Sequence, residues 1–330
     1  MLSVNFFSPF ASGIFAVFAV LFGVFFKEKI ARISSIIICL LGVVASFAPI
    51  YLINRTVTED TSAIILIVGI SYQIFLSLIA VASMIIIASD SRSNINRFES
   101  YPLILLSFSG MLFAVFSESI LGMYLGIELF SISGYILAGL NREKPTSNEA
   151  IVKYFVMGAA SSALMIYGIS LIYGFTGGSL SVSTLDVITL NFNKLPLTIG
   201  FLLFAFGIFF KTSNFPFHFW APDVYYGINT PALSFLSIAP KLAAFAVLFK
   251  IVVFNVEHIP FTLDIFYNVM AFFAGASMLI GAIGGLRQTS IKRIIAYSGI
   301  AHMGFVLCIF SVSYQASLAL NVLYYFLIYT

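Results

Sequence analysis

Charged residues are scarce in this sequence, and their scarcity excludes most classes of soluble protein. Asp, Glu, Lys and Arg make up only 9% of the 330 residues, whereas hydrophobic residues make up 61%. Soluble domains contain about 25% charged residues, so this composition indicates a membrane protein. The net charge of +3 is too small in such an apolar chain to indicate a nucleic-acid partner.

Motifs that bind redox cofactors or metals are also missing. The two cysteines, Cys39 and Cys308, stand alone inside apolar runs, which excludes a self-contained iron–sulfur centre or structural zinc site. There is no GxGxxG fingerprint for a dinucleotide and no pair of histidines placed to ligate haem. We therefore expect this chain to bind no cofactor and no metal.

Long apolar stretches account for most of the chain. A transmembrane helix needs about 20 apolar residues, and the sequence predicts an all-α polytopic membrane protein with about 11 such helices. The predicted helices cover residues 5–26, 30–53, 62–88, 101–117, 119–140, 149–174, 196–212, 230–253, 264–285, 293–313 and 315–329.

Positive charges gather in the loops that follow the odd-numbered stretches. These loops hold ten of the sixteen Lys and Arg residues: Lys27, Lys29, Arg32, Arg92, Arg97, Arg142, Lys144, Arg287, Lys292 and Arg293. The loops after even-numbered stretches hold Arg55 and Lys194. Because basic loops stay in the cytoplasm or mitochondrial matrix, we predict an N-terminus outside a bacterial inner membrane or a mitochondrial inner membrane.

Apart from the basic loops and Lys250 near a helix end, three cations lie within apolar stretches, namely Lys153, Lys211 and Lys241. Among the acids, Glu128 lies in the middle of a stretch. A Lys or Asp at the centre of a membrane helix costs roughly 2.5–3.5 kcal/mol, so charges there are candidates for function. Each also has a purely structural interpretation. Lys153, in the first turn or so of its stretch, can snorkel to the interface, and Glu128 can form an ion pair that holds two helices together.

Prolines stand beside the two central lysines. Pro216 and Pro222 follow Lys211, and Pro240 immediately precedes Lys241. Proline removes a backbone donor, and broken helices at membrane depth are tolerated only where they are packed in protein or line a cavity. We expect a break after Lys211 and a kink at Pro240, which frees the Leu236 carbonyl beside Lys241.

Two histidines accompany these lysines. His218 follows Lys211 by seven residues, and His302 lies in the middle of the tenth stretch. Each imidazole can either relay protons or only hydrogen-bond across helices.

The strings LGIELFSISGYILAGL, FFKTSNFPFHFWAPDVYYGINTPALSFLSIAPK and QTSIKRIIAYSGIAHMGF resemble the antiporter-like membrane subunits of respiratory complex I, NADH:quinone oxidoreductase. PDVY after the tryptophan and the lysine of the eighth stretch favour the N-type subunit. The resemblance covers roughly residues 100–330.

The resemblance implies a proton-conducting fold of two inverted five-helix repeats. Three helices at 1–100 would precede a first repeat at 101–254, and 255–330 would be an incomplete second repeat. The family has about fourteen helices, so we expect a C-terminally truncated chain.

The resemblance also implies a proton relay and a set of partners. Its relay candidates are Glu128, Lys211, Lys241, His218 and His302, and Lys153 is a further candidate. NADH, FMN, iron–sulfur clusters and quinone would belong to partner subunits, and the partners would be the other membrane subunits of the complex.

Other classes of membrane protein remain open. A stand-alone cation/proton antiporter of the D-type, or another secondary transporter, also uses broken helices and midplane charges. Sodium sites favour carboxylate and carbonyl oxygens, so three lysines against one glutamate favour protons. A structural membrane subunit without its own channel is a third interpretation.

The topology is directly testable. Single cysteines placed at Ser93 and Asn191 should react with impermeant thiol reagents from opposite sides of the membrane, because the loops at 90–99 and 287–292 are basic and the loop around 191 is not. The measurement is labelling of right-side-out and inverted vesicles. Labelling of both cysteines from the outside would contradict the predicted orientation.

Overall fold

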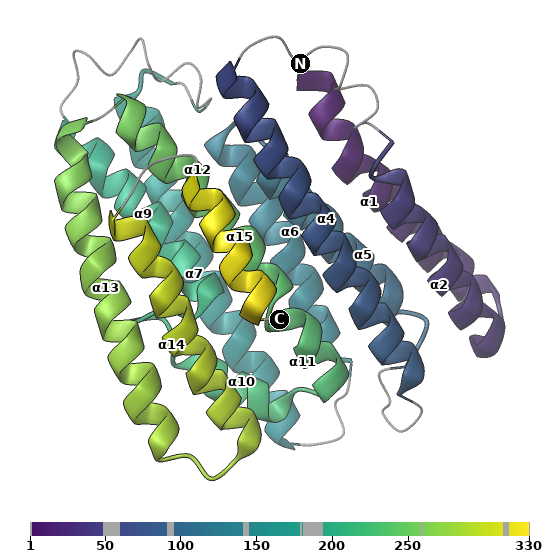
Figure 1. Cartoon of the computed structure of the whole chain (residues 1–330). Coiled ribbons are helices and arrows are strands. Elements are labelled where there is room, and N and C mark those ends of the chain that lie inside the picture. Colours follow the sequence, from purple (N-terminus) through teal and green to yellow (C-terminus); the bar gives the residue numbers. More distant parts are fainter. Residues whose placement is uncertain are drawn as a thin grey trace. The chain divides into compact units, whose positions relative to one another are not determined.

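The computed structural model describes residues 2–48, 60–90, 96–140, 145–178, 180, 194–258, 260–312 and 317–329. The secondary-structure elements of these residues are all helices (Figure 1). They are α1 (Leu2–Phe25), α2 (Glu28–Ala45), α4 (Asp60–Ser89), α5 (Ser100–Phe116), α6 (Ile120–Ala138), α7 (Pro145–Phe175), α9 (Lys194–Thr212), α10 (Trp220–Gly227), α11 (Thr230–Leu236), α12 (Ala239–His258), α13 (Pro260–Leu286), α14 (Ile291–Val312) and α15 (Ser317–Tyr329).

Each predicted apolar stretch coincides with helical structure. Within the described residues, eight segments are long and apolar enough to cross a membrane, and α5 and α15 are shorter apolar helices. The chain is therefore a multi-pass membrane protein. Ser93, Asn191 and the loop residues Arg55, Arg92, Arg142 and Lys144 lie outside the described residues.

Several helix boundaries differ from those predicted, and two of the differences bear on the candidate site. Helix α7 begins at Pro145, four residues before the predicted start, because proline fits the first turn of a helix, where no intrahelical donor is needed. The single kinked helix predicted over 230–253 is two helices, α11 and α12, interrupted at Ser237 and Ile238. Pro240 has no N–H and its ring crowds the carbonyl four residues earlier, so regular helical bonding ends at Leu236.

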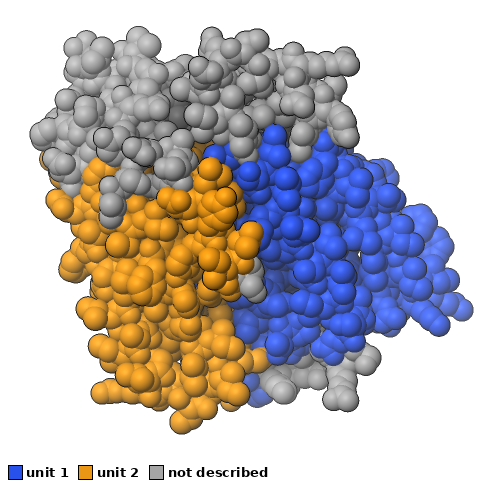
Figure 2. Space-filling model, viewed as in Figure 1, with its two compact units in different colours: residues 1–117, 125–147, 228–243 blue, residues 118–124, 148–227, 244–330 orange. Residues whose placement is uncertain are grey.

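The chain divides into two compact units (Figure 2). Unit 1 comprises residues 1–117, 125–147 and 228–243, and unit 2 comprises residues 118–124, 148–227 and 244–330.

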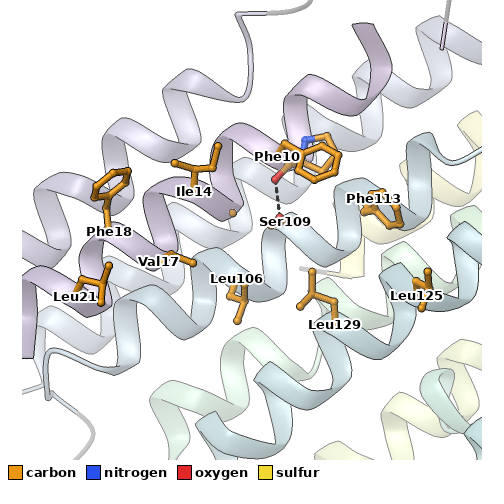
Figure 3. A pocket seen from close by; sticks show the side chains of 12 residues that line it. Phe10, Ile14, Val17, Phe18, Leu21, Leu106, Ser109, Phe113, Leu125 and Leu129 are labelled. Atoms are coloured by element: carbon orange, nitrogen blue, oxygen red, sulfur yellow. Dashed lines mark hydrogen bonds between the residues drawn. The ribbon is translucent and has the colours of Figure 1, made fainter. Parts of the chain in front are cut away.

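Helix α1 of unit 1 packs against α2 and α5. The Ser109 hydroxyl on α5 donates a 2.6 Å hydrogen bond to the Pro9 carbonyl on α1. An apolar groove of about 590 Å³ lies between α1, α5 and the unit 1 part of α6, with this bond in its wall (Figure 3). Buried polar contacts of this kind hold helices together in the absence of a hydrophobic driving force.

Helices α13 and α14 of unit 2 form a closely packed hairpin (Figure 1). A Cβ added at Gly281 would lie 2.5 Å from the Ala301 backbone nitrogen, and one at Gly304 would lie 2.9 Å from the Ala274 carbonyl oxygen. The two backbones therefore approach at positions where only glycine fits, as is common between membrane helices. This hairpin supports the candidate site described below.

Candidate functional site

Helix α9 ends one residue after Lys211, in a capped turn. Ser213 has a φ of 58°, in the left-handed region. The amide of Ser213 donates to the Phe210 carbonyl and the amide of Asn214 donates to the Phe209 carbonyl, at 3.0 and 2.8 Å. These two bonds and the left-handed residue form a Schellman motif, which ends the helix before Pro216 is reached.

Both prolines lie after this cap in the sequence and therefore do not end α9. The Phe215–Pro216 peptide bond is cis, and Pro216 lies in the turn that connects α9 to α10. Pro222 lies in the first turn of α10, where a missing N–H costs nothing. The expected break after Lys211 is present. It is made by the cap at Ser213, which the sequence analysis did not predict.

Side chains of unit 2 form hydrogen bonds with backbone groups that the break leaves without partners in a helix. The Phe215 amide donates to the Ser277 hydroxyl on α13 at 2.9 Å, and the Asn214 side-chain amide donates to the same oxygen at 3.4 Å. The Trp220 indole donates to the Phe210 carbonyl at 3.2 Å. Irregular backbone in an apolar protein needs such partners, and they hold the segment after Lys211 in one conformation.

Lys211 near the end of α9 and His218 in the turn that follows are both buried, each with about 5% of its surface exposed. The Lys211 ammonium lies 5.4 Å from the ring centroid of Phe210 at the carbonyl end of α9, where a helix favours positive charge. The His218 ring packs on Phe219 with a centroid distance of 4.2 Å. His218 lies outside the candidate spans, and its burial lowers the pKa of the imidazole, which favours the neutral ring.

Lys241 is the third residue of α12, not the twelfth of a continuous helix as predicted. Its side chain is only 1% exposed. The hydrogen bonding of α12 begins with the Leu242 amide, which donates to the Ile238 carbonyl at 3.0 Å, so Pro240 lies in the first turn of the helix. Lys241 is therefore buried at a helix start that follows an interruption.

Glu128 is the ninth residue of α6, as predicted, and is half-buried. Glu128 and Lys241 belong to unit 1, whereas Lys211, His218, His302 and Lys153 belong to unit 2. The pairing of Glu128 with Lys211 stays a prediction.

His302 contacts α15. Its Nδ1 lies 2.7 Å from the Tyr325 hydroxyl, and its ring centroid lies 5.1 Å from that of Tyr329. The imidazole thus makes the hydrogen bond between helices that was one of its two predicted interpretations.

Lys153 does not lie in the first turn of its helix, because α7 begins two turns before it. Its ammonium lies 2.7 Å from both Glu149 Oε1 and Asp223 Oδ2. The other Asp223 oxygen lies 3.2 Å from Arg293 Nη2. Sequence reasoning missed Asp223 and Arg293 because each partner is 70 residues away, and no local spacing reports such a contact.

Comparison with known protein families supplies independent evidence on the family to which this chain belongs. Residues 117–330 match the family described as "NADH:quinone oxidoreductase/Mrp antiporter, TM". The chain belongs to this family. The resemblance expected from the motifs is thereby confirmed, and the antiporter family match begins between α5 and α6.

Individual members of this antiporter family give more detail. The chain is 38% identical over 251 residues to NADH-quinone oxidoreductase subunit N 1 of Rhizobium meliloti, covering 76% of this chain and 52% of the relative. The chain thus spans about half the length of that relative.

Solved structures show the same fold. One chain of respiratory complex I from Thermus thermophilus with bound aureothin matches with a TM-score of 0.76 and 27% identity, over 97% of this chain and 68% of that one. A chain of the membrane-bound sulfane sulfur reductase, an archaeal respiratory membrane complex, matches with a TM-score of 0.84 over 99% of this chain and 68% of that one. At 20% identity the second match supports the fold alone.

Metal-ligating side chains do not gather in the described ranges, where no group of three or more His, Cys, Asp or Glu residues is placed to hold an ion. The titratable side chains placed above, those of Lys211, Lys241, Glu128, His218 and His302, are amines, a carboxylate and imidazoles, which are groups that can exchange protons.

Ser213 tests the cap that ends α9. A β-branched residue is strongly disfavoured at positive φ, so Ser213→Val should lower the free energy of unfolding by about 1–2 kcal/mol or more. Ser213→Gly should be neutral or stabilising, because glycine adopts this conformation freely and the buried Ser213 hydroxyl has no hydrogen-bond partner among the described residues.

The measurement is thermal unfolding of the purified protein in detergent. Ser83→Val is the matched control, because Ser83 is also buried but lies within α4 and bonds only to its own helix. If Ser213→Val and Ser83→Val unfold at the same temperature, positive φ at Ser213 does not define the turn.

Proposed function

We propose that this chain is the proton-translocating N-type membrane subunit of an NADH:quinone oxidoreductase in a bacterial inner membrane. The observation that carries the proposal is a buried lysine, Lys211, at a capped helix break inside the region that matches the antiporter family. The similarity to a bacterial subunit N supports the N-type assignment. Electron transfer from NADH through FMN and iron–sulfur clusters to quinone would take place in partner subunits.

The proposed topology has about eleven transmembrane helices with the N-terminus outside. Residues 1–100 would contribute three helices, 101–254 the first five-helix repeat and 255–330 part of an inverted second repeat. The helices found in every predicted apolar stretch support this arrangement. The break between α9 and α10 supplies the discontinuous helix that such repeats use at their ion sites.

The proposed mechanism is a movable ion pair. Desolvation of a lysine favours the neutral amine, whereas a nearby carboxylate favours the ammonium. If Glu128 approaches Lys211, the lysine holds its proton, and if Glu128 withdraws or is protonated, the proton passes toward Lys241. The burial of both lysines supports this role, because an exposed amine would remain protonated at neutral pH.

The remaining candidates extend this path. His218 is buried in the turn beyond Lys211, where a neutral imidazole can accept a proton. His302, hydrogen-bonded to Tyr325, would belong to the second repeat. The Lys153 side chain is about 42% exposed, which supports a place for it at the entrance of the proposed path, where protons are taken up.

A cation/proton antiporter subunit is the second candidate function. The matched family includes Mrp antiporters, which favours it. The two functions differ in their energy source, so proton movement in membrane vesicles should require NADH oxidation only for the oxidoreductase subunit. Co-purification of the chain with a large redox complex is likewise expected only for the oxidoreductase subunit.

Glu128 and Lys211 test the relay. Replacing either by Ala should lower NADH-driven proton pumping in the intact complex far more than it lowers assembly. Removing one partner of a purely structural buried pair leaves an uncompensated charge, costs about 3–5 kcal/mol and harms assembly first. The measurements are complex content by native electrophoresis and pumping per assembled complex. Poor assembly with normal pumping per complex would favour the structural role.

A substitution at Lys241 tests whether pumping requires an amine that releases its proton or only a positive charge. Arginine keeps the positive charge but holds its proton to a pKa above about 12, so Lys241→Arg should assemble normally and lose most of the pumping. Lys250→Arg is the matched control, because Lys250 lies on the same helix near the end of the same span and is less buried. Wild-type pumping by Lys241→Arg would show that a fixed charge suffices there.

A further inference from the structure

Asp223 joins three helices of unit 2. It lies in the first turn of α10, and its two carboxylate oxygens face different partners. Oδ2 lies 2.7 Å from the Lys153 ammonium on α7, and Oδ1 lies 3.2 Å from Arg293 Nη2 on α14. One carboxylate therefore connects α10 to helices on either side of it in the sequence.

The charges around Asp223 compensate one another. Glu149, one turn before Lys153 on α7, adds a second carboxylate at 2.7 Å from the same ammonium. The Arg293 guanidinium also lies 5.0 Å from the ring centroid of Tyr226 on α10. Two acids and two bases thus form one connected cluster, and the aromatic contact adds a cation–π interaction between α14 and α10.

Stability alone is a poor reason for this cluster. The side chains of Lys153, Asp223 and Arg293 are 42%, 36% and 39% exposed. Ion pairs at such exposure contribute little to the free energy of folding wherever water reaches and screens them. A carboxylate that bridges two cations does, however, fix the direction in which each cation points.

The cluster also fixes the segment that follows Lys211. This segment is attached near its start to Ser277 on α13, through the Phe215 amide. Asp223 attaches its other end to Arg293 on α14, and Trp220 between them stacks on Tyr154 of α7 at 4.7 Å. The turn after Lys211 is thus held at both ends by the α13–α14 hairpin and from the other side by α7.

We propose that Asp223 is a positioning residue for proton transfer, which orients the Lys153 ammonium and holds α10 against α14. This inference rests on the proposed function, in which Lys153 takes up protons and Lys211 passes them on. Asp223 itself transfers no proton in this role. Its charge keeps the amino groups of Lys153 on α7 and Lys211 on α9 at a fixed distance and orientation.

The test uses the assembled complex in membrane vesicles and four variants. Asp223→Asn keeps the shape and removes the charge, so assembly should stay near wild type while protons pumped per NADH fall by about twofold or more, since misplaced groups transfer poorly. Arg293→Gln should act in the same direction, and Asp223→Glu should restore most of the pumping. Arg287→Gln is the control, because it removes the same charge from an exposed position just before α14.

The Asp223→Asn/Arg293→Gln double variant tests whether the two residues act together. If they form one contact, the double variant should pump no worse than the more impaired single variant. Pumping per NADH at the wild-type level in Asp223→Asn, multiplied losses in the double variant, or no rescue by Asp223→Glu would overturn the proposal. A loss of assembly alone, with protons per NADH unchanged, would also overturn it.

Lys211→Ala in the same vesicles separates this inference from the proposed function. If Lys211→Ala lowers pumping and Asp223→Asn does not, only the positioning role fails. If neither variant lowers pumping, the proposed proton path through this chain is wrong.

Discussion

Backbone groups released at a helix end inside an apolar protein must find partners within the protein, and the segment after Lys211 depends on this constraint. A Schellman turn at Ser213 uses the Phe209 and Phe210 carbonyls of α9, and the Trp220 indole donates a second hydrogen bond to the Phe210 carbonyl. The Ser277 hydroxyl accepts from the Phe215 amide just beyond the turn. A lysine can therefore stand at a break in the helix while these backbone groups keep hydrogen-bond partners. The proposed proton path requires this arrangement, because a continuous helix offers no polar opening.

Hydropathy was sufficient to predict the long apolar helices, because the cost of placing backbone and charge in lipid leaves few alternatives to them. It did not predict the short helix α10 or the interruption between α11 and α12. Proline was a less reliable guide to their ends. Pro145 starts α7, Pro222 lies harmlessly in the first turn of α10, and Pro240 follows an interruption that divides a predicted helix in two. The chemistry of proline is the same at each position, but its consequence depends on where the helix begins, which hydropathy does not specify.

The candidate site was predictable only in part. Buried charges in apolar stretches identified Lys211 and Lys241, since burial of an amine is costly wherever it occurs. The sequence analysis used Asp223 only as part of the PDVY motif, because nothing in the local sequence indicates its partners. Its importance comes from Lys153 and Arg293, each 70 residues away, and only the packing of α7, α10 and α14 brings them together.

The segment after Lys211 is attached to the α13–α14 hairpin at two points, through Ser277 and through Arg293. Ser277 and Arg293 lie on opposite arms of the α13–α14 hairpin, whose arms are locked together by close backbone contacts at Gly281 and Gly304. A shift of the hairpin as a body would therefore move both ends of the segment between α9 and α10, and with them the surroundings of Lys211. His302 lies on the same hairpin, so a rearrangement around its Tyr325 bond would be transmitted to the same segment. In the proposed function, the same pair of closely packed helices would carry the histidine of the second half-path and would support the broken helix of the first.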